Sequence, residues 1–335
     1  MAKRKWFYRG MKHELKIAII FLLLTSCLVP PFHFPVLAES TQVVRPKIGL
    51  ALGGGGARGA AHIGVLRVFE RENIPVDYLV GTSAGAFTAA LYSGGISPDD
   101  IEKHILSGAI QKVYKTDLSM FRAFFIHLNK ITHTFFGRPF YACIYNDHRL
   151  QHFINQTISK NDGSIELTIP LHIIAVDLIT GLPVVIKSGD VGLAVQASTA
   201  IPTLHQPIHI NDELLVDGGV LKNIPVEEAK KMGSDIVIAV DVDAKLEQTN
   251  LNNFRTFQGI ITRVISIGLK AQSEHILNKA DIVISPDLNG VGILNLDPKS
   301  LAKAIKAGEE EAERMLPKIK KRIEEKAYAM RIAEK

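Results

Sequence analysis

The chain has 335 residues, of which 47% are apolar and 22% charged, and this suffices for one large or two small folded domains. Its formal net charge of +5 lies in residues 1–38, where six Lys or Arg side chains stand against the single acid Glu14. The remainder is close to neutral, which argues against the nucleic-acid partner that a uniformly basic chain would suggest.

Residues 1–38 have the pattern of an export leader. Basic residues precede an uncharged apolar run of 13 residues, from Ile17 to Val29. A helix that spans the hydrocarbon core of a membrane needs about 20 residues, and Pro30 and Pro31 stop this run. The sequence therefore predicts an exported protein, secreted or held in the cell envelope, rather than one with a permanent transmembrane anchor.

Two processing sites compete within this leader. Val36-Leu37-Ala38 offers the usual spacing for signal-peptide release, which would leave a soluble protein that begins at Glu39. Leu24-Thr25-Ser26-Cys27 resembles a bacterial lipobox, which would make Cys27 the lipid-carrying first residue of a lipoprotein. Residues 39–45 are expected to form a linker to the folded part.

From residue 46 to residue 290, short apolar runs alternate with helical stretches, which is typical of an α/β fold with a mostly parallel central sheet and helices on both faces. The pattern predicts strands at residues 47–52, 76–80, 171–176, 183–187, 214–216, 235–242 and 281–284. It predicts helices at residues 60–73, 84–92 and 257–280. Residues 291–335 are expected to form a C-terminal helical extension, interrupted by Pro317.

Between residues 97 and 158 the alternation gives way to a helical, aromatic-rich insertion. Its rings belong to Phe121, Phe124, Phe125, Phe135, Phe136, Phe140 and Tyr141. Two interpretations stay open. The insertion is a subdomain with its own aromatic core, or it is a lid or access surface for acyl chains, since lipid enzymes need exposed apolar area near the site.

A G-x-S-x-G sequence, Gly81-Thr82-Ser83-Ala84-Gly85, lies between a predicted strand and a predicted helix. In this context the glycines allow a tight, strained turn that lifts the serine hydroxyl clear of the sheet. The start of the following helix favours negative charge and so assists a developing alkoxide. Ser83 is therefore the candidate nucleophile, with an ordinary glycine turn as the alternative.

A glycine-rich loop at residues 53–59 follows the first predicted strand, in a place where some folds bind nucleotides. A Rossmann fold requires an acid at the end of its second strand, but Asp77 lies at the start of that strand. A Walker loop requires Gly-Lys followed by Ser or Thr, but Gly59 is followed by Ala60. Both comparisons argue against a nucleotide site.

The same glycines suit a different role. Gly54, Gly55 and Gly56 can turn bare backbone N–H groups toward an acyl oxygen as it becomes negative, which is the chemistry of an oxyanion hole. Crossover loops of a parallel sheet emerge at one edge, so this loop and Ser83 can be neighbours.

A serine nucleophile also needs a base. His62 is the histidine nearest in sequence to the glycine loop, but its place on the following helix favours packing or capping. The other candidates are carboxylates at predicted strand ends: Asp177, Asp217 and Asp241. Asp217 stands out because Gly218 and Gly219 follow it and leave room for a substrate.

Together, Gly54-Gly55-Gly56-Ala57-Arg58-Gly59, Gly81-Thr82-Ser83-Ala84-Gly85 and Asp217-Gly218-Gly219 resemble the motifs of the patatin-like phospholipases, as does the stretch at residues 197–202. The resemblance covers about residues 46–290. It implies an α/β fold in which a dyad of Ser83 and Asp217 replaces the usual triad. It also implies an oxyanion hole in the glycine loop, with Arg58 ordering that loop or touching the substrate.

The activity implied by this resemblance is that of a serine lipid acyl hydrolase, of phospholipase A or lysophospholipase type, acting through an acyl-enzyme. It needs no cofactor, and the sequence contains no His or Cys cluster with metal-ligand spacing. An acyl-ester lipid and a membrane surface are the expected partners. The alternatives are a broad esterase or thioesterase with another substrate, and an envelope protein that keeps the fold but only binds.

Overall fold

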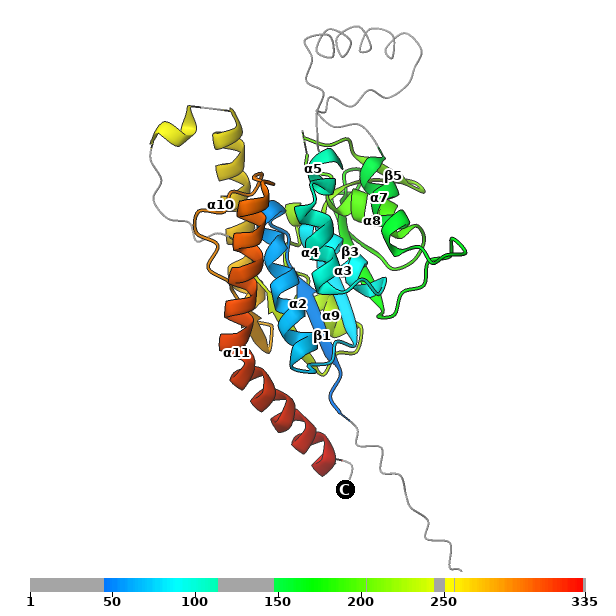
Figure 1. Cartoon of the computed structure of the whole chain (residues 1–335), viewed down its shortest axis with the longest axis vertical. Helices are drawn as coiled ribbons and strands as arrows, with labels where there is room; N and C mark the ends of the chain where they lie inside the picture. Colours follow the sequence, from blue (N-terminus) through cyan, green and yellow to red (C-terminus); the bar gives the residue numbers. More distant parts are fainter. Residues whose placement is uncertain (1–44, 114–147, 203, 244–250, 256, 334–335) are drawn as a thin grey trace, which may run out of the picture. The chain divides into compact units, whose positions relative to one another are not determined.

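The computed structural model describes residues 45–113, 148–202, 204–243, 251–255 and 257–333 (Figure 1). The leader, both processing sites and all but the last residue of the linker lie outside these ranges. So do the seven aromatic residues singled out within the insertion. Residues 45–335 form one compact unit by their internal contacts.

The strands of the described residues form one sheet, in the order β5-β6-β3-β2-β1-β7-β8, with β4 paired to β3. Its strands are β1 (Ile48–Leu52), β2 (Tyr78–Thr82), β3 (Leu171–Asp177), β4 (Pro183–Ile186), β5 (Ile208–Ile210), β6 (Glu213–Asp217), β7 (Ile236–Val240) and β8 (Ile282–Ile284). Five neighbouring strands are parallel, in the order β3-β2-β1-β7-β8. At the β3 side, β4, β5 and β6 add antiparallel pairs. The predicted α/β fold is confirmed.

Two strands differ from their predictions. The strand expected at residues 76–80 runs from Tyr78 to Thr82, because Gly81, taken as its end, pairs with Leu52 of β1 inside the ladder. The short strand β5 was not predicted at all, and it is held by pairing with β6.

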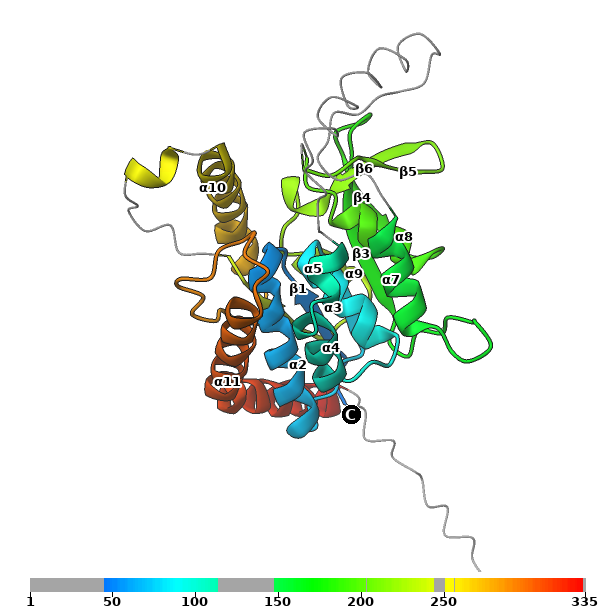
Figure 2. The same ribbon diagram turned by 45° about the horizontal axis from the view of Figure 1, so that its top comes forward.

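Helices cover both faces of the sheet (Figures 1 and 2). The α-helices are α2 (Ala61–Arg71), α3 (Ala84–Ser93), α4 (Pro98–Leu106), α5 (Ala109–Val113), α7 (Arg149–Ile158), α8 (Val191–Ser198), α9 (Val226–Lys231), α10 (Phe257–Leu277) and α11 (Pro298–Ala333). Side chains of β1 alternate between two apolar clusters: Leu50 packs with α2, α3 and α11, and Ala51 packs with α9. Burial on both faces explains the unbroken apolar sequence of β1 and β7.

The described ends of the insertion belong to the main core. Ile101 of α4, Ile110 of α5 and Ile154 of α7 are buried in the same cluster as the sheet. Residues 97–113 and 148–158 therefore contribute to the main core, whereas the aromatic residues on which both interpretations of the insertion depend lie outside the described residues.

The C-terminal helix is also part of the main core, so no domain boundary falls at residue 290. Apolar residues along α11, among them Leu301 and Ile319, are fully buried, and the helix packs along α2. A Cβ on Gly308 would lie 2.0 Å from the carbonyl oxygen of Ala61, so glycine is required for this close approach. The helix continues through Pro317, where an interruption was predicted, and bends in its second half (Figure 1). Buried apolar residues lie on both sides of the proline, and their packing stabilises the helix there.

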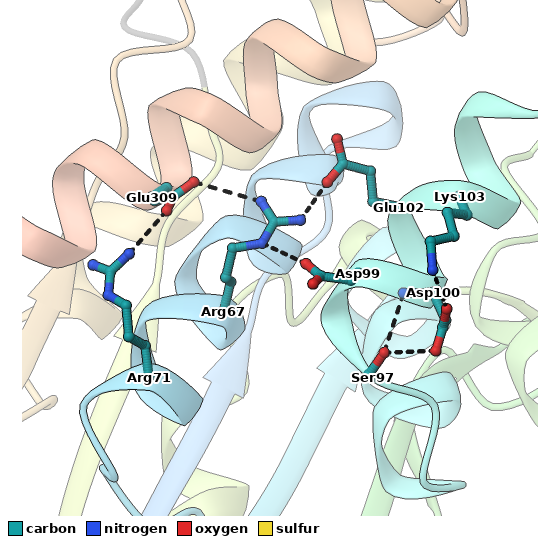
Figure 3. Close-up of polar contacts among 8 residues, drawn as sticks. All are labelled: Arg67, Arg71, Ser97, Asp99, Asp100, Glu102, Lys103 and Glu309. Atoms are coloured by element: carbon teal, nitrogen blue, oxygen red, sulfur yellow. Dashed lines mark hydrogen bonds and ion pairs between the residues drawn. The ribbon is translucent and has the colours of Figure 1, made fainter.

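Arg67 of α2 joins three elements by ion pairs (Figure 3). Its guanidinium contacts Asp99 and Glu102 of α4 and Glu309 of α11. The side chain of Ser97 accepts a hydrogen bond from the backbone N–H of Asp100 and so caps the start of α4. These partly exposed contacts order the helical face and contribute about 1 kcal/mol or less each.

In the described part of the chain, no helix is both long and apolar enough to cross a membrane.

Candidate active site

Ser83 occupies the sharp turn between β2 and α3. It has φ 52° and ψ −120°, a left-handed conformation that costs energy for any residue with a Cβ. The flanking glycines permit the turn: a Cβ on Gly81 would lie 2.5 Å from Cα of Ala86, and one on Gly85 would lie 2.2 Å from the carbonyl oxygen of Leu52. The G-x-S-x-G sequence thus builds a strained strand-to-helix turn with the serine at its tip.

The hydroxyl of Ser83 donates a 2.6 Å hydrogen bond to Oδ2 of Asp217, at the end of β6. The other carboxylate oxygen of Asp217 accepts from the backbone N–H of Gly219 at 2.8 Å. Both side chains are buried, with 7% and 6% of Ser83 and Asp217 exposed. Burial raises the pKa of Asp217 to about 6, against the opposing effect of the hydrogen bonds from Ser83 and Gly219. A carboxylate with that pKa is a better proton acceptor near neutral pH than an ordinary aspartate.

The stretch at residues 197–202 positions both residues of this pair. Ser198 Oγ accepts a 2.8 Å hydrogen bond from the backbone N–H of Ser83 and donates to the carbonyl oxygen of Ile174. The carbonyl of Ala200 accepts from the backbone N–H of Asp217 at 2.9 Å. Sequence reasoning noted this stretch as family-like but assigned Ser198 no role.

The glycine loop lies directly against Ser83, because a Cβ on Gly54 would be 2.9 Å from Cβ of Ser83. The N–H of Gly54 already donates to Asn223, to its backbone oxygen at 3.3 Å and to its Oδ1 at 3.2 Å. Within the described ranges, the N–H groups of Gly55 and Gly56 donate to nothing. Of the three glycines predicted to form an oxyanion hole, these two have donors available.

Arg58 and Gly59 fasten the other end of the loop. Arg58 Nε donates a 2.7 Å hydrogen bond to the carbonyl oxygen of Val291. A Cβ on Gly59 would lie 2.3 Å from Cβ of Ala84, so glycine lets the loop reach the start of α3. Of the two roles implied for Arg58, these contacts fit that of ordering the loop.

The other candidate bases have different partners. Nε2 of His62 is 2.8 Å from the carbonyl oxygen of Gly53, and burial lowers the pKa of this histidine to about 4. Asp177 accepts hydrogen bonds from Thr180 and closes the β3–β4 turn. Asp241, near the end of β7, accepts from the backbone N–H of Asp243. Across the described residues, no group of three or more His, Cys, Asp and Glu could hold a metal ion.

Two polar residues at the same edge of the sheet were not predicted from the sequence: Asn223, which is buried, and Asp243, which is partly buried. Asn223 follows the Asp217 turn, and Asp243 follows β7; the two side chains are joined by a 3.1 Å hydrogen bond. A signal existed for Asp243, since it lies beyond a strand end as Asp217 does. Nothing local distinguished Asn223 from a polar loop residue.

A strained serine on a strand-to-helix turn, bonded to a buried aspartate beside a glycine loop, is the arrangement of serine hydrolases on an α/β sheet. Residues 50–230 match the family model described as patatin-like phospholipase, and the chain belongs to this family. The predicted resemblance is confirmed. The matched range contains Ser83, Asp217 and the glycine loop.

Similar proteins agree with this family. The chain is 31% identical over 239 residues to "Lysophospholipase NTE1" of Scheffersomyces stipitis, covering 69% of this chain and 14% of that protein. It is 27% identical over 308 residues to "Uncharacterized NTE family protein Mb2594" of Mycobacterium bovis, covering 84% of this chain and 49% of that protein. The chain thus spans less than half the length of these relatives. The crystal structure of VipD from Legionella pneumophila has a similar fold, with a TM-score of 0.50 at 15% identity over 82% of this chain and 67% of that one.

Proposed function

We propose that this protein is a serine lipid acyl hydrolase, of phospholipase A or lysophospholipase type, with Ser83 as nucleophile and Asp217 as proton acceptor. The 2.6 Å hydrogen bond between Ser83 Oγ and Asp217 Oδ2, in a buried site, carries this proposal. Membership of the patatin-like phospholipase family and similarity to a lysophospholipase support the substrate class.

In the proposed reaction, Asp217 takes the hydroxyl proton as Ser83 Oγ attacks the carbonyl carbon of an acyl ester. The N–H groups of Gly55 and Gly56 stabilise the oxyanion of the tetrahedral intermediate. The alcohol or lysolipid leaves with the proton from Asp217, and the acyl group stays on Ser83. Asp217 then takes a proton from a water molecule that attacks the acyl carbon, and it passes this proton to Ser83 Oγ as the bond to the acyl group breaks and the fatty acid leaves. None of these steps needs a cofactor.

The pKa of Asp217 predicts how activity depends on pH. Only the deprotonated carboxylate accepts a proton, and burial places its pKa at about 6 instead of 3.8. We therefore expect kcat/KM to be highest above pH 6 and to fall about tenfold per pH unit below it. Rates on a soluble short-chain ester between pH 4.5 and 8 measure this.

Asp243 provides the control, because burial also raises its pKa to about 6. In Asp243→Asn the acid limb should persist near pH 6 at whatever rate remains. Disappearance of the limb in this variant would assign the titration to Asp243 and contradict the role given to Asp217.

A membrane surface is the proposed place of action. Ser83 follows the carboxyl end of β2, and turns leaving this edge of the sheet carry five exposed apolar side chains: Leu178, Ile179, Leu182, Val220 and Leu221. Ile179 is 67% exposed and Leu221 46%. Apolar side chains grouped around a lipid site favour contact with a bilayer.

Removing two of these side chains tests the proposal. The double variant Ile179→Ser, Leu182→Ser should hydrolyse phospholipid vesicles roughly tenfold more slowly, because less apolar area partitions into the bilayer. Its rate on a soluble ester should stay unchanged. Ile332→Ser, at an exposed position of α11, is the matched control and should alter neither rate. Wild-type protein that cleaves soluble esters but no phospholipid would favour the esterase or thioesterase alternative.

Export is proposed from the sequence pattern of residues 1–38. Mass spectrometry of the protein from its native host distinguishes the two processing sites. A lipoprotein would begin at a diacylated Cys27, and a soluble product would begin at Glu39. An unprocessed chain beginning at Met1 in the cytoplasm would contradict export.

A further inference from the structure

Asn223 is the one side chain, among the described residues, that hydrogen-bonds both backbone groups of Gly54. Its Oδ1 accepts from the Gly54 N–H at 3.2 Å, and its Nδ2 lies 3.3 Å from the Gly54 carbonyl oxygen. The backbone oxygen of Asn223 also accepts from that N–H. The Gly54 carbonyl and the Gly55 N–H belong to one peptide group, so these contacts fix the direction of the Gly55 donor and of the peptide group before it.

Asp243 and Ser273 hold the amide of Asn223 in turn. Nδ2 of Asn223 donates to Oδ1 of Asp243 at 3.1 Å, and the hydroxyl of Ser273, on α10, is 2.5 Å from Oδ2. All three side chains are buried or nearly so, with only 2% of Asn223 exposed. Burial makes alternative partners scarce, so the amide has a single favourable orientation.

The proposed chemical steps use none of these three residues, yet they lie behind the loop that faces the nucleophile. A Cβ on Gly54 would lie 2.9 Å from Cβ of Ser83, so the two backbones are in close contact. A preorganised oxyanion donor is worth a large rate factor only while its direction is fixed. A shift of the Gly54 peptide would carry the following two N–H groups with it.

We propose that Asn223, held by Asp243 and Ser273, is a positioning residue that fixes the glycine loop for stabilisation of the oxyanion. The inference rests on the proposed hydrolase function and adds a residue to it. Asn223 acts through Gly54 and touches no reacting atom. Its loss should therefore weaken binding of the transition state and leave binding of the ground state nearly intact.

Asn223→Ala tests this proposal in the full-length protein. We expect kcat on a soluble ester to fall about 100-fold, with KM changed less than about threefold. A trifluoromethyl ketone, which forms a tetrahedral adduct with a serine, should lose affinity by the same factor as kcat/KM. Binding of the fatty acid product should stay as in the wild type. A purely structural role would not separate these two ligands.

The chain offers a matched control in Asn155. Its Oδ1 accepts from the N–H of Gly192 and its Nδ2 donates to Asp190, the same pattern of amide, glycine and aspartate away from Ser83. Asn155→Ala should lower the melting temperature without selective loss of inhibitor affinity. Equal effects of the two variants on kcat and inhibitor affinity would overturn the proposal.

Ser273→Ala covers the case in which Asn223→Ala does not fold, since it leaves Asn223 in place and removes only the Ser273 hydroxyl, which contacts Asp243 and the carbonyl oxygen of Leu269 in its own helix. It should lower kcat several-fold with KM unchanged. If folded Asn223→Ala has the kcat of the wild type, the positioning role is overturned. If Asn223→Ala is unfolded, a wild-type kcat in Ser273→Ala overturns it instead. Wild-type protein with neither ester hydrolysis nor inhibitor binding would instead contradict the proposed function.

Discussion

Ser83→Ala is expected to reduce ester hydrolysis by roughly 10⁵-fold while the protein stays folded. The substitution removes the attacking oxygen and, with it, the hydrogen bond to Asp217, and it leaves the backbone of the turn unchanged. Initial rates on a soluble ester, with circular dichroism of the same sample, measure both effects.

Ser93→Ala is the matched control, because Ser93 is a buried serine at the other end of α3 whose hydroxyl bonds the carbonyl of Ile169. It should retain nearly full activity. If folded Ser83→Ala kept more than about 1% of wild-type activity, Ser83 would not be the nucleophile.

Asp217→Asn is expected to reduce kcat by about 10⁴-fold. The amide has the same shape and can still hydrogen-bond Ser83, but its single oxygen cannot accept from both Ser83 and the N–H of Gly219, and it cannot take the proton. Residues of one catalytic unit fail together, so the double variant with Ser83→Ala should be no slower than Ser83→Ala alone.

His62→Ala separates this mechanism from one with a histidine base. His62 contacts the carbonyl of Gly53, so its loss should cost far less than that of Asp217. If His62→Ala were inactive and Asp217→Asn active, the base would be His62 and the catalytic pair would be serine and histidine.

Much of the fold could be predicted because its signals are local. β1 and β7 are covered on both faces and therefore apolar at every position. The errors arose where tertiary contacts decide. β5 is only three residues long and depends on β6. α11 continues through Pro317 because its buried residues pack along α2, hundreds of positions away in sequence.

The site divides in the same way. Ser83, Asp217 and the glycine loop carry motifs that could be found in the sequence. Asn223 contacts Gly54 across 169 positions of sequence, and Ser198 contacts Ser83 across 115. Such pairs have no local pattern, so only the folded chain reveals that one glycine N–H is already bonded and two are available.

Reaction with a fluorophosphonate, followed by peptide mapping, tests directly whether Ser83 is the nucleophile. The reagent phosphonylates a serine whose hydroxyl is activated beside an oxyanion hole. We expect one adduct per chain, on the peptide that contains Ser83. The adduct should be absent in Ser83→Ala and form much more slowly in Asp217→Asn. Active protein that takes up no label, or that is labelled at another residue, would contradict this expectation.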